Sequence, residues 1–343
     1  MSKRIAFCAD GTWQTPENHT NVYRLYKALT LGADQMPFYD EGVGADGNPI
    51  IALAGGAFGT GLWEKIKRGY SKIAHVYEKG DDLYLFGFSR GAYTARSLAG
   101  MIAAVGLPTQ NFTDDLVETA FTAYREKIDR ARWLAKLKDC NMYVPDIKMV
   151  GVWDTVGSLG IPAVAGFCDP IVYGFLDTSL SPRIKNACHA LAIDEKRLQF
   201  QPTLWTNKPV AGQLLEQVWF TGCHTDVGGG AKQVPFGDPS LSDITLGWMM
   251  ARAKVLGLTF DQAVLDQYKL PIPPAYALDD YHESWTIING LPYQRPIGKD
   301  AMLANSVSVR CKLKNTYRPG ALKFTKTGLS KQYALSVVVD DAK

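Results

Sequence analysis

Short runs of apolar residues alternate along the chain with longer segments in which apolar residues recur every three or four positions. The short runs predict buried β-strands, and the longer segments predict amphipathic helices. Strands are predicted over residues 4–9, 36–40, 82–86, 146–152, 188–193 and 217–221. Helices are predicted over residues 21–31, 62–77, 90–105, 114–138 and 245–256.

This alternation is typical of an α/β protein with a mostly parallel central sheet and helices on both faces. We expect a single α/β domain over residues 1–343, with its core at about residues 1–260. The apolar stretch 155–182 could form a lid or acyl-binding wall, or a helix of the core. The periodic pattern weakens after about residue 270, so residues 261–343 are predicted to be a C-terminal appendage packed on the core.

Composition and charge exclude some classes of function. The 343 residues are 46% hydrophobic and 21% charged, which is ordinary for a globular domain. The net charge is only +3, and the densest basic stretches, such as the one around Lys65, are short. We therefore expect no nucleic-acid partner, because a binding face for nucleic acid needs clustered Lys and Arg.

The cysteines and the N-terminus bear on the cellular compartment. The six cysteines are scattered without a C-x-x-C pair, which predicts neither a metal site nor a disulfide framework. The apolar run before Asp10 is too short for a signal-peptide core, and no run reaches the roughly 20 residues of a spanning helix. We expect a cytoplasmic protein, while export without a leader would leave no mark in the sequence.

A candidate nucleophile lies in residues 87–91, Gly-Phe-Ser-Arg-Gly, which match the pattern G-x-S-x-G. A nucleophile elbow requires a sharp turn from a strand into a helix, and here a predicted strand runs into the motif and a predicted helix runs out. Larger residues in place of Gly87 and Gly91 would collide with the neighbouring strand or helix. The pattern therefore predicts that Ser89 is the nucleophile of a serine hydrolase.

A nucleophilic serine needs a base, and the base needs an orienting acid. His224 is the best base among five histidines, because it follows a strand in a glycine-rich loop, where we expect it to be exposed. The acid is expected between serine and histidine in the chain. Asp154 and Asp194 both end strands in that interval, and strand position alone does not choose between them.

Oxyanion donors are expected at two turns. The backbone N–H of Arg90 lies at a helix start, where it could donate to an oxyanion. The turn after the first strand could supply a second N–H, from Gly11 or Thr12, with Asp10 bracing the loop by local hydrogen bonds. An ordinary Asp-Gly turn is the alternative.

Six blocks of the sequence resemble the α/β-hydrolase family that contains the phospholipase effectors of type VI secretion systems and many uncharacterised bacterial and fungal members. The blocks are FCADGTW (7–13), YDEGVG (39–44), LFGFSRGAYTAR (85–96), GVWDTVG (151–157), HALAIDE (189–195) and WFTGCHTDVGGG (219–230). The resemblance implies a triad of Ser89, Asp154 and His224, and so favours Asp154 over Asp194. Asp226, in the same block as His224, is a supporting candidate.

The resemblance also implies hydrolysis of carboxylic esters, with phospholipid or another lipid as substrate. Two departures stand out: the chain lacks room for the large membrane-anchoring modules of the effectors, and Cys223 occupies a position where an aliphatic residue is expected. We expect no metal or organic cofactor. We also expect a transient contact with a membrane surface. The alternative is a catalytically silent binding protein on the same fold.

Overall fold

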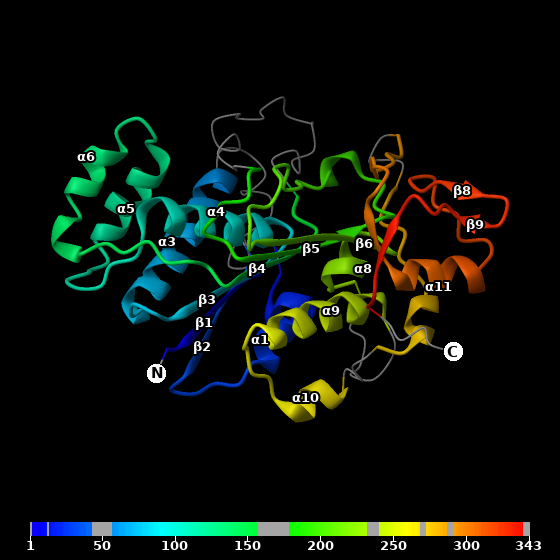
Figure 1. Cartoon of the computed structure of the whole chain (residues 1–343), viewed down its shortest axis with the longest axis horizontal. Helices are drawn as coiled ribbons and strands as arrows, with labels where there is room; N and C mark the ends of the chain where they lie inside the picture. Colours follow the sequence, from blue (N-terminus) through cyan, green and yellow to red (C-terminus); the bar gives the residue numbers. More distant parts are fainter. Residues whose placement is uncertain are drawn as a thin grey trace.

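The computed structural model of the chain describes residues 2–11, 14–42, 57–156, 178–231, 240–267, 272–286 and 291–338. These residues form one central sheet with helices packed against both of its faces (Figure 1). The predicted fold class, an α/β architecture with a mostly parallel sheet, is confirmed.

The sheet of the described residues has eight strands, and every neighbouring pair is parallel. The strands are β1 (Arg4–Ala9), β2 (Gln35–Asp40), β3 (Asp82–Phe88), β4 (Met149–Trp153), β5 (Asn186–Ala192), β6 (Leu214–Phe220), β7 (Met302–Ala304) and β10 (Ala334–Ser336). Their order across the sheet is β10-β7-β6-β5-β4-β3-β1-β2. Because parallel strands need crossover connections, the chain must cover both faces.

Two helical layers do this (Figure 1). Helices α3 (Ala57–Val76), α4 (Arg90–Val105) and α5 (Leu116–Arg125) lie over one face, with Ile66 and Leu98 in a buried cluster there. Helices α1 (Asn21–Ala28) and α9 (Leu241–Val255) lie over the other face, with Leu25 and Trp248 in a second cluster. The apolar strand residues alternate between the two clusters, which explains why the strands are apolar on both sides.

The strand order creates a crevice where β1 and β3 lie side by side. From β1 the chain first moves outward to β2, and it then returns to add β3, β4, β5, β6 and β7 on the opposite side. At such a switch point the connections after adjacent strands diverge to opposite faces of the sheet, and ligands bind at the carboxyl ends of the strands. Gly11 follows β1 and Ser89 follows β3, so both lie at this crevice.

The C-terminal region, which comprises the residues after about 260, contributes to the sheet itself through β7 and β10. It also contains the helix α11 (Asn305–Leu313) and the small hairpin β8 (Phe324–Thr325) and β9 (Gly328–Leu329). The remaining short elements are α6 (Arg130–Ala135), α8 (His224–Gly228), α10 (Gln262–Gln267) and the 3₁₀ helices at Pro16–Asn18, Lys138–Cys140, Leu198–Phe200 and Pro274–Leu278.

The single helix predicted over residues 114–138 is wrong. The structure has two helices there, α5 and α6, because the backbone leaves helical geometry at Glu126, with φ −82° and ψ 76°. The Arg130 side chain donates to the carbonyls of Ala123 and Tyr124 and so closes the end of α5. Most of the predicted lid segment, residues 157–177, lies outside the described residues.

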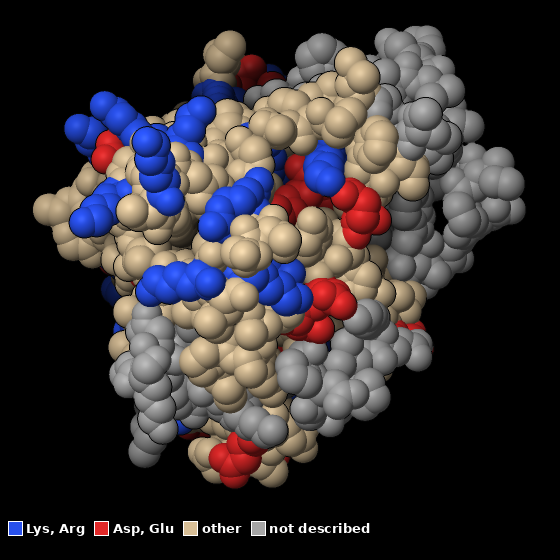
Figure 2. Space-filling view, turned by 90° about the vertical axis from the view of Figure 1, so that its right-hand side faces the viewer, with Lys and Arg blue, Asp and Glu red and all other residues tan. Residues whose placement is uncertain are grey.

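Residues 291–338 are rich in basic side chains, of which Arg295 and Arg310 are buried. Residues 291–338 contain nine Lys and Arg and a single acidic residue, Asp300. On the side of the molecule where the C-terminal region lies, Lys and Arg side chains gather over part of the face, with some Asp and Glu beside them (Figure 2). The whole-chain charge of +3 hides this local excess. In the described parts of the chain, no helix has the length and apolar character needed to cross a bilayer.

Candidate active site

Ser89 lies on the turn between β3 and α4. Its backbone has φ 57° and ψ −121°, a strained combination for a residue with a side chain. The Ser89 N–H donates to the carbonyl of Trp153 at 3.0 Å, which ties the turn to the end of β4. Strain of this kind persists only where the surroundings enforce it, and it aims the serine hydroxyl above the sheet edge.

The two glycines of the motif are required by close backbone approaches. A Cβ atom on Gly91 would lie 2.1 Å from the carbonyl oxygen of Ala9 in β1. A Cβ atom on Gly87 would lie 2.3 Å from the carbonyl oxygen of Gly91. These contacts pack the elbow tightly against the end of β1, as the sequence predicts.

Asp154 and His224 form a buried pair. The Nδ1 atom of His224 lies 2.6 Å from Oδ2 of Asp154. The side chain of Asp154 is fully buried, and His224 is 4% exposed. Since an ionised carboxylate only accepts hydrogen bonds, Nδ1 carries the proton and Nε2 is left as the basic nitrogen.

The backbone at Asp154 is held from several directions. Asp154 has φ 40°, and its N–H donates to the carbonyl of Ala190 at 2.8 Å. The N–H of Ala192 donates to Oδ1 of Asp154 at 3.0 Å, and the N–H of Thr155 donates to Nε2 of His189 at 3.1 Å. Burial lowers the pKa of His189 to about 3, so this histidine is a neutral structural acceptor.

The expectation that His224 is exposed in a loop is wrong. His224 is the first residue of α8, and its ring is enclosed by two phenylalanines. The Phe88 ring centroid lies 4.5 Å from that of His224, and the Phe200 centroid lies 4.9 Å away at an interplanar angle of 72°. Phe88 immediately precedes Ser89, so this packing places the imidazole beside the elbow.

The electrostatics keep the acid charged and the base neutral. Burial alone would raise the pKa of Asp154, but the guanidinium of Arg295 and the hydrogen bond from His224 hold that pKa well below its usual range. Burial lowers the pKa of His224 below its ordinary value, although Asp154 and Glu195 act in the opposite direction. At neutral pH the site therefore contains an aspartate and a neutral imidazole, the resting state that a general base requires.

Asp194, the alternative acid, has other partners. Its Oδ2 accepts from the N–H of Gly222 at 2.7 Å and from the hydroxyl of Tyr317 at 2.7 Å. Its own N–H donates to the carbonyl of Gly222. Asp194 thus links the end of β5 to the end of β6 and to the C-terminal region, and the imidazole of His224 is bonded to Asp154.

The turn after β1 lies against the elbow. A Cβ atom on Gly11 would lie 3.4 Å from Cβ of Ser89. Asp10 accepts from the N–H of Gly11 at 2.7 Å and from the hydroxyls of Thr20 and Tyr39. Burial raises the pKa of Asp10 to about 6 even though these donors lower it.

The contact with Asp10 has a consequence for the predicted oxyanion hole. Because the Gly11 N–H already donates to Asp10, the donor that this turn could still offer is Thr12, which lies outside the described residues. Arg90 is the first residue of α4, at a helix end where backbone N–H groups lack intrahelical partners.

Two residues at the site were missed by the sequence analysis. Arg295 is 1% exposed and binds both carboxylate oxygens of Asp154, at 2.6 and 2.9 Å. Glu195 accepts from the backbone N–H of His224 at 3.2 Å and is itself paired with Arg197. Glu195 could have been found from its place next to Asp194 at a strand end, but the segment around Arg295 has no periodic pattern that would reveal it.

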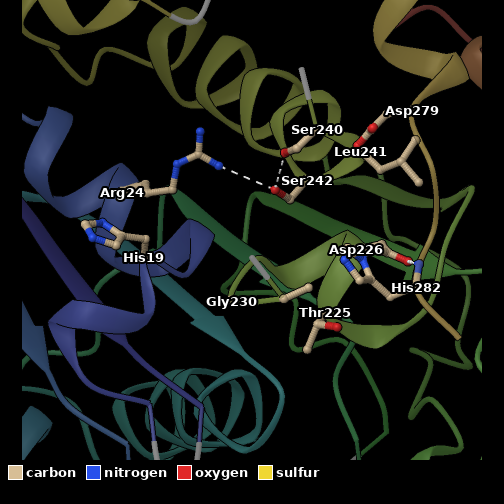
Figure 3. Close-up of a pocket in the computed structure, with 11 residues that line it drawn as sticks. His19, Arg24, Thr225, Asp226, Gly230, Ser240, Leu241, Ser242, Asp279 and His282 are labelled. Carbon is tan, nitrogen blue, oxygen red and sulfur yellow. Dashed lines mark hydrogen bonds and ion pairs between the residues drawn. The ribbon is translucent and has the colours of Figure 1, made fainter. Parts of the chain in front are cut away.

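Asp226 lines a small pocket beside α8. It binds the imidazole and the backbone N–H of His282, and it accepts from the N–H of Cys223 at 2.9 Å. Figure 3 shows the facing pair Asp226 and His282 on one side of the pocket and Arg24 with Ser242 on another. Asp226 therefore supports α8, which carries His224, by binding the C-terminal region.

Neither this pocket nor a larger cavity of about 590 Å³ along α4 has Ser89, Asp154 or His224 among its described lining residues. The walls of the larger cavity include Arg96, Tyr124 and Trp205. The five cysteines of the described segments are free and buried, and Cys168 lies outside them. No group of three or more potential metal ligands occurs in the described segments.

Comparisons with known proteins agree with the resemblance seen in the sequence. The family model for the type VI secretion system phospholipase effector Tle1-like catalytic domain matches residues 3–252. The uncharacterized protein YEL023C of Saccharomyces cerevisiae is 28% identical over 273 residues, which cover 71% of this chain and 38% of the yeast protein.

Two solved structures are similar in part. An uncharacterized protein from Pseudomonas aeruginosa is 17% identical, with a TM-score of 0.45 over 78% of this chain and 48% of that one. The Tle1 effector bound to the VgrG spike is 20% identical, with a TM-score of 0.39 over 70% of this chain and 52% of that one. The chain thus spans at most about half the length of these relatives. Because the family model matches most of its length, the chain belongs to the family of Tle1-like phospholipase effector catalytic domains of the type VI secretion system.

Proposed function

We propose that the protein is a serine hydrolase that cleaves carboxylic esters of lipids through Ser89, His224 and Asp154. The observation that carries this proposal is the buried 2.6 Å contact between His224 and Asp154. The imidazole of His224 also packs on Phe88, the residue before the strained Ser89. A serine at an elbow becomes nucleophilic when an oriented imidazole accepts its proton.

In the first step, the Ser89 hydroxyl oxygen attacks the ester carbonyl carbon, and Nε2 of His224 takes the hydroxyl proton. The tetrahedral intermediate then expels the alcohol, which receives that proton from the imidazolium. Asp154 holds the imidazole in the tautomer with Nδ1 protonated and stabilises the positive charge that develops on it.

In the second step, His224 removes a proton from water, and the hydroxide attacks the acyl-enzyme. Collapse of the second tetrahedral intermediate releases the carboxylic acid and returns the proton to Ser89. Backbone N–H groups of Arg90 and of the Gly11–Thr12 turn are proposed to bind the oxyanion.

The lipid part of the proposal rests on family membership. The family model is that of the catalytic domain of Tle1-like phospholipase effectors. It matches residues 3–252, which include all three proposed catalytic residues. The alternative, a silent binding protein, would keep the fold without a reactive serine. Preservation of the strained elbow, the buried acid and the oriented base together favours the enzyme, since a scaffold has no need of them.

A panel of p-nitrophenyl esters of rising chain length, run beside phospholipids, tests this function. We expect hydrolysis by the wild type and a loss of about four to six orders of magnitude in kcat for Ser89→Ala. Circular dichroism should show an unchanged fold, because alanine removes only one hydroxyl. Full esterase activity in the Ser89→Ala variant, or none in the wild type on any ester, would contradict the proposal.

We further propose that the basic C-terminal face contacts anionic lipid surfaces. Its cations include the exposed Lys312, Lys323 and Lys326, and Leu313, which follows Lys312 in the chain, is 65% exposed. Each Lys near an anionic membrane contributes about 1 kcal/mol of attraction, and an exposed leucine can enter the interface.

Reversing three of these charges tests the contact. We expect Lys312→Glu/Lys323→Glu/Lys326→Glu to bind vesicles rich in phosphatidylglycerol at least about tenfold more weakly than the wild type. Arg132→Glu/Lys136→Glu/Lys138→Glu is the matched control, because it changes the net charge equally around α6, at the other end of the molecule (Figure 1). Equal losses in the two variants would refute a role for the C-terminal face.

A further inference from the structure

We propose that Arg295 is a positioning residue of the active site, which fixes the carboxylate of Asp154 and thereby sets the basicity of His224. This inference rests on the proposed function, and it assigns a role in catalysis to a residue outside the segment matched by the family model, residues 3–252. The buried fork between Arg295 and Asp154 is the observation that carries it.

Both oxygens of the Asp154 carboxylate are held by hydrogen bonds from Arg295. Nη1 of Arg295 lies 2.6 Å from Oδ1, and Nη2 lies 2.9 Å from Oδ2, so the planar guanidinium and carboxylate face each other. Nη1 also donates to the carbonyl of Ala192 at 2.8 Å, and Nη2 donates to the carbonyl of Phe200. Arg295 therefore links three parts of the site: the end of β5, Phe200, which packs on the His224 ring, and Asp154 itself.

Oδ2 of Asp154 is shared, since it accepts from both Nη2 of Arg295 and Nδ1 of His224. A carboxylate that is already paired with a cation stabilises a neighbouring imidazolium less strongly. The guanidinium also disfavours a nearby imidazolium directly, because the two charges have the same sign. Arg295 should therefore keep His224 neutral, and able to accept the serine proton, at lower pH than Asp154 alone would allow.

The other charged groups around His224 are few among the described residues. Glu195 faces it from the segment after β5, accepting the His224 backbone N–H, and it raises the pKa of His224. The charge of Glu195 is offset by Arg197 at 2.8 Å, and Ser284 donates to the same carboxylate at 3.1 Å. Arg295 is thus the cation that directly contacts the acid of the triad.

Arg295 belongs to a segment that contacts the site repeatedly. His282 binds Asp226 on α8, Ser284 binds Glu195, and Arg295 binds Asp154. Asp154 is the proposed acid, Asp226 lies on α8 with His224, and Glu195 accepts the backbone N–H of His224. Through these three side chains, the described residues 282–286 and 291–295 contact α8 and the loops that follow β4 and β5.

The test is the pH dependence of kcat/KM and of the His224 imidazole in Arg295→Met, Arg295→Lys and a control. Arg310 supplies that control, because it is also buried in the C-terminal region and donates to two backbone carbonyls, those of Ala277 and Asp279. Arg310→Met removes a buried guanidinium of the same kind without touching the triad.

For Arg295→Met we expect kcat/KM to fall by about 10- to 100-fold, as for a displaced catalytic group. The acidic limb of its pH profile should move to higher pH by on the order of one unit. Arg295→Lys keeps the charge but not the fork, so its limb should stay near that of the wild type while kcat falls. Arg310→Met should change neither the limb nor kcat/KM.

The imidazole titration of His224, followed by NMR with labelled histidine and assigned with His224→Gln, does not depend on turnover. The pKa of His224 obtained from this titration should rise in Arg295→Met and stay unchanged in Arg310→Met. A folded Arg295→Met variant with a wild-type titration overturns the proposal, as does a wild-type kcat in Arg295→Lys if Arg295→Met fails to fold. If no ester is hydrolysed but the titration shifts, the proposed function fails while the coupling of Arg295 to His224 stands.

Discussion

The residues up to 252 and the C-terminal region contribute to the site in different ways. In the first part, Ser89, Asp154 and His224 follow the ends of β3, β4 and β6, where a parallel sheet gathers side chains at one edge. In the second part, no residue is proposed to react, yet Arg295 and His282 bind carboxylates at or beside that edge. The groups proposed to react and the groups that hold them therefore come from separate stretches of the chain.

The two regions also differ in the forces that order them. Residues of the first part are placed by apolar packing on both faces of the sheet and by strained turns such as the one at Ser89. The C-terminal contacts with the site are polar and buried, as in the fork between Arg295 and Asp154 and the bond from Tyr317 to Asp194. Since a buried charge left without its partner is costly, these few contacts can order a segment that has little periodic pattern.

The largest effect that sharpens this comparison is expected at the two candidate acids. Asp154→Asn should lower kcat by about 10⁴-fold, because an amide in place of the carboxylate favours the wrong tautomer of His224. Asp194→Asn should change kcat by less than about tenfold, since Asp194 binds Gly222 and Tyr317 instead. Steady-state kinetics on one soluble ester measures both.

If the two variants lose activity equally, the contact of Asp154 with His224 does not identify the acid. Urea unfolding of both variants separates a catalytic effect from a structural one. Asp194→Asn should lose stability of about 1–3 kcal/mol, because a charged acceptor of two buried donors becomes neutral.

The smallest effect is expected at Tyr317, a contact of the C-terminal region that does not reach the triad. Tyr317→Phe removes one hydrogen bond to Asp194 and should cost about 1 kcal/mol of unfolding free energy. The activity should stay within about twofold of the wild type, as for a substitution that removes only a structural contact. A loss of activity like that expected for Arg295→Met would show that the C-terminal contacts act together rather than individually.

The sequence predicts most of the site in the first part of the chain because its signals there are local. The elbow at Ser89 needs only a strand, a turn with two glycines and a helix, all adjacent in the chain. The order of the strands then brings Asp154 and His224 to the same edge. The buried position of His224 was not predicted, because Phe200, which encloses its ring, lies in a different connection.

Other features depend on contacts between distant residues and leave no local trace. Arg295 lies 141 positions from Asp154, and nothing near it in the sequence marks it as buried. The strands β7 and β10 are only three residues each and escape a search for longer apolar runs. The division of the predicted helix 114–138 into α5 and α6 is set by the side chain of Arg130, which apolar periodicity does not register.

The most direct measurement is labelling of the protein with a fluorophosphonate probe, followed by mass spectrometry of the modified peptide. An oriented imidazole should activate one serine, so the adduct is predicted on Ser89, strongly reduced in His224→Gln and Asp154→Asn and retained in Asp194→Asn. An unmodified Ser89 in the folded wild-type protein, or labelling that persists at full rate without His224, would contradict the account.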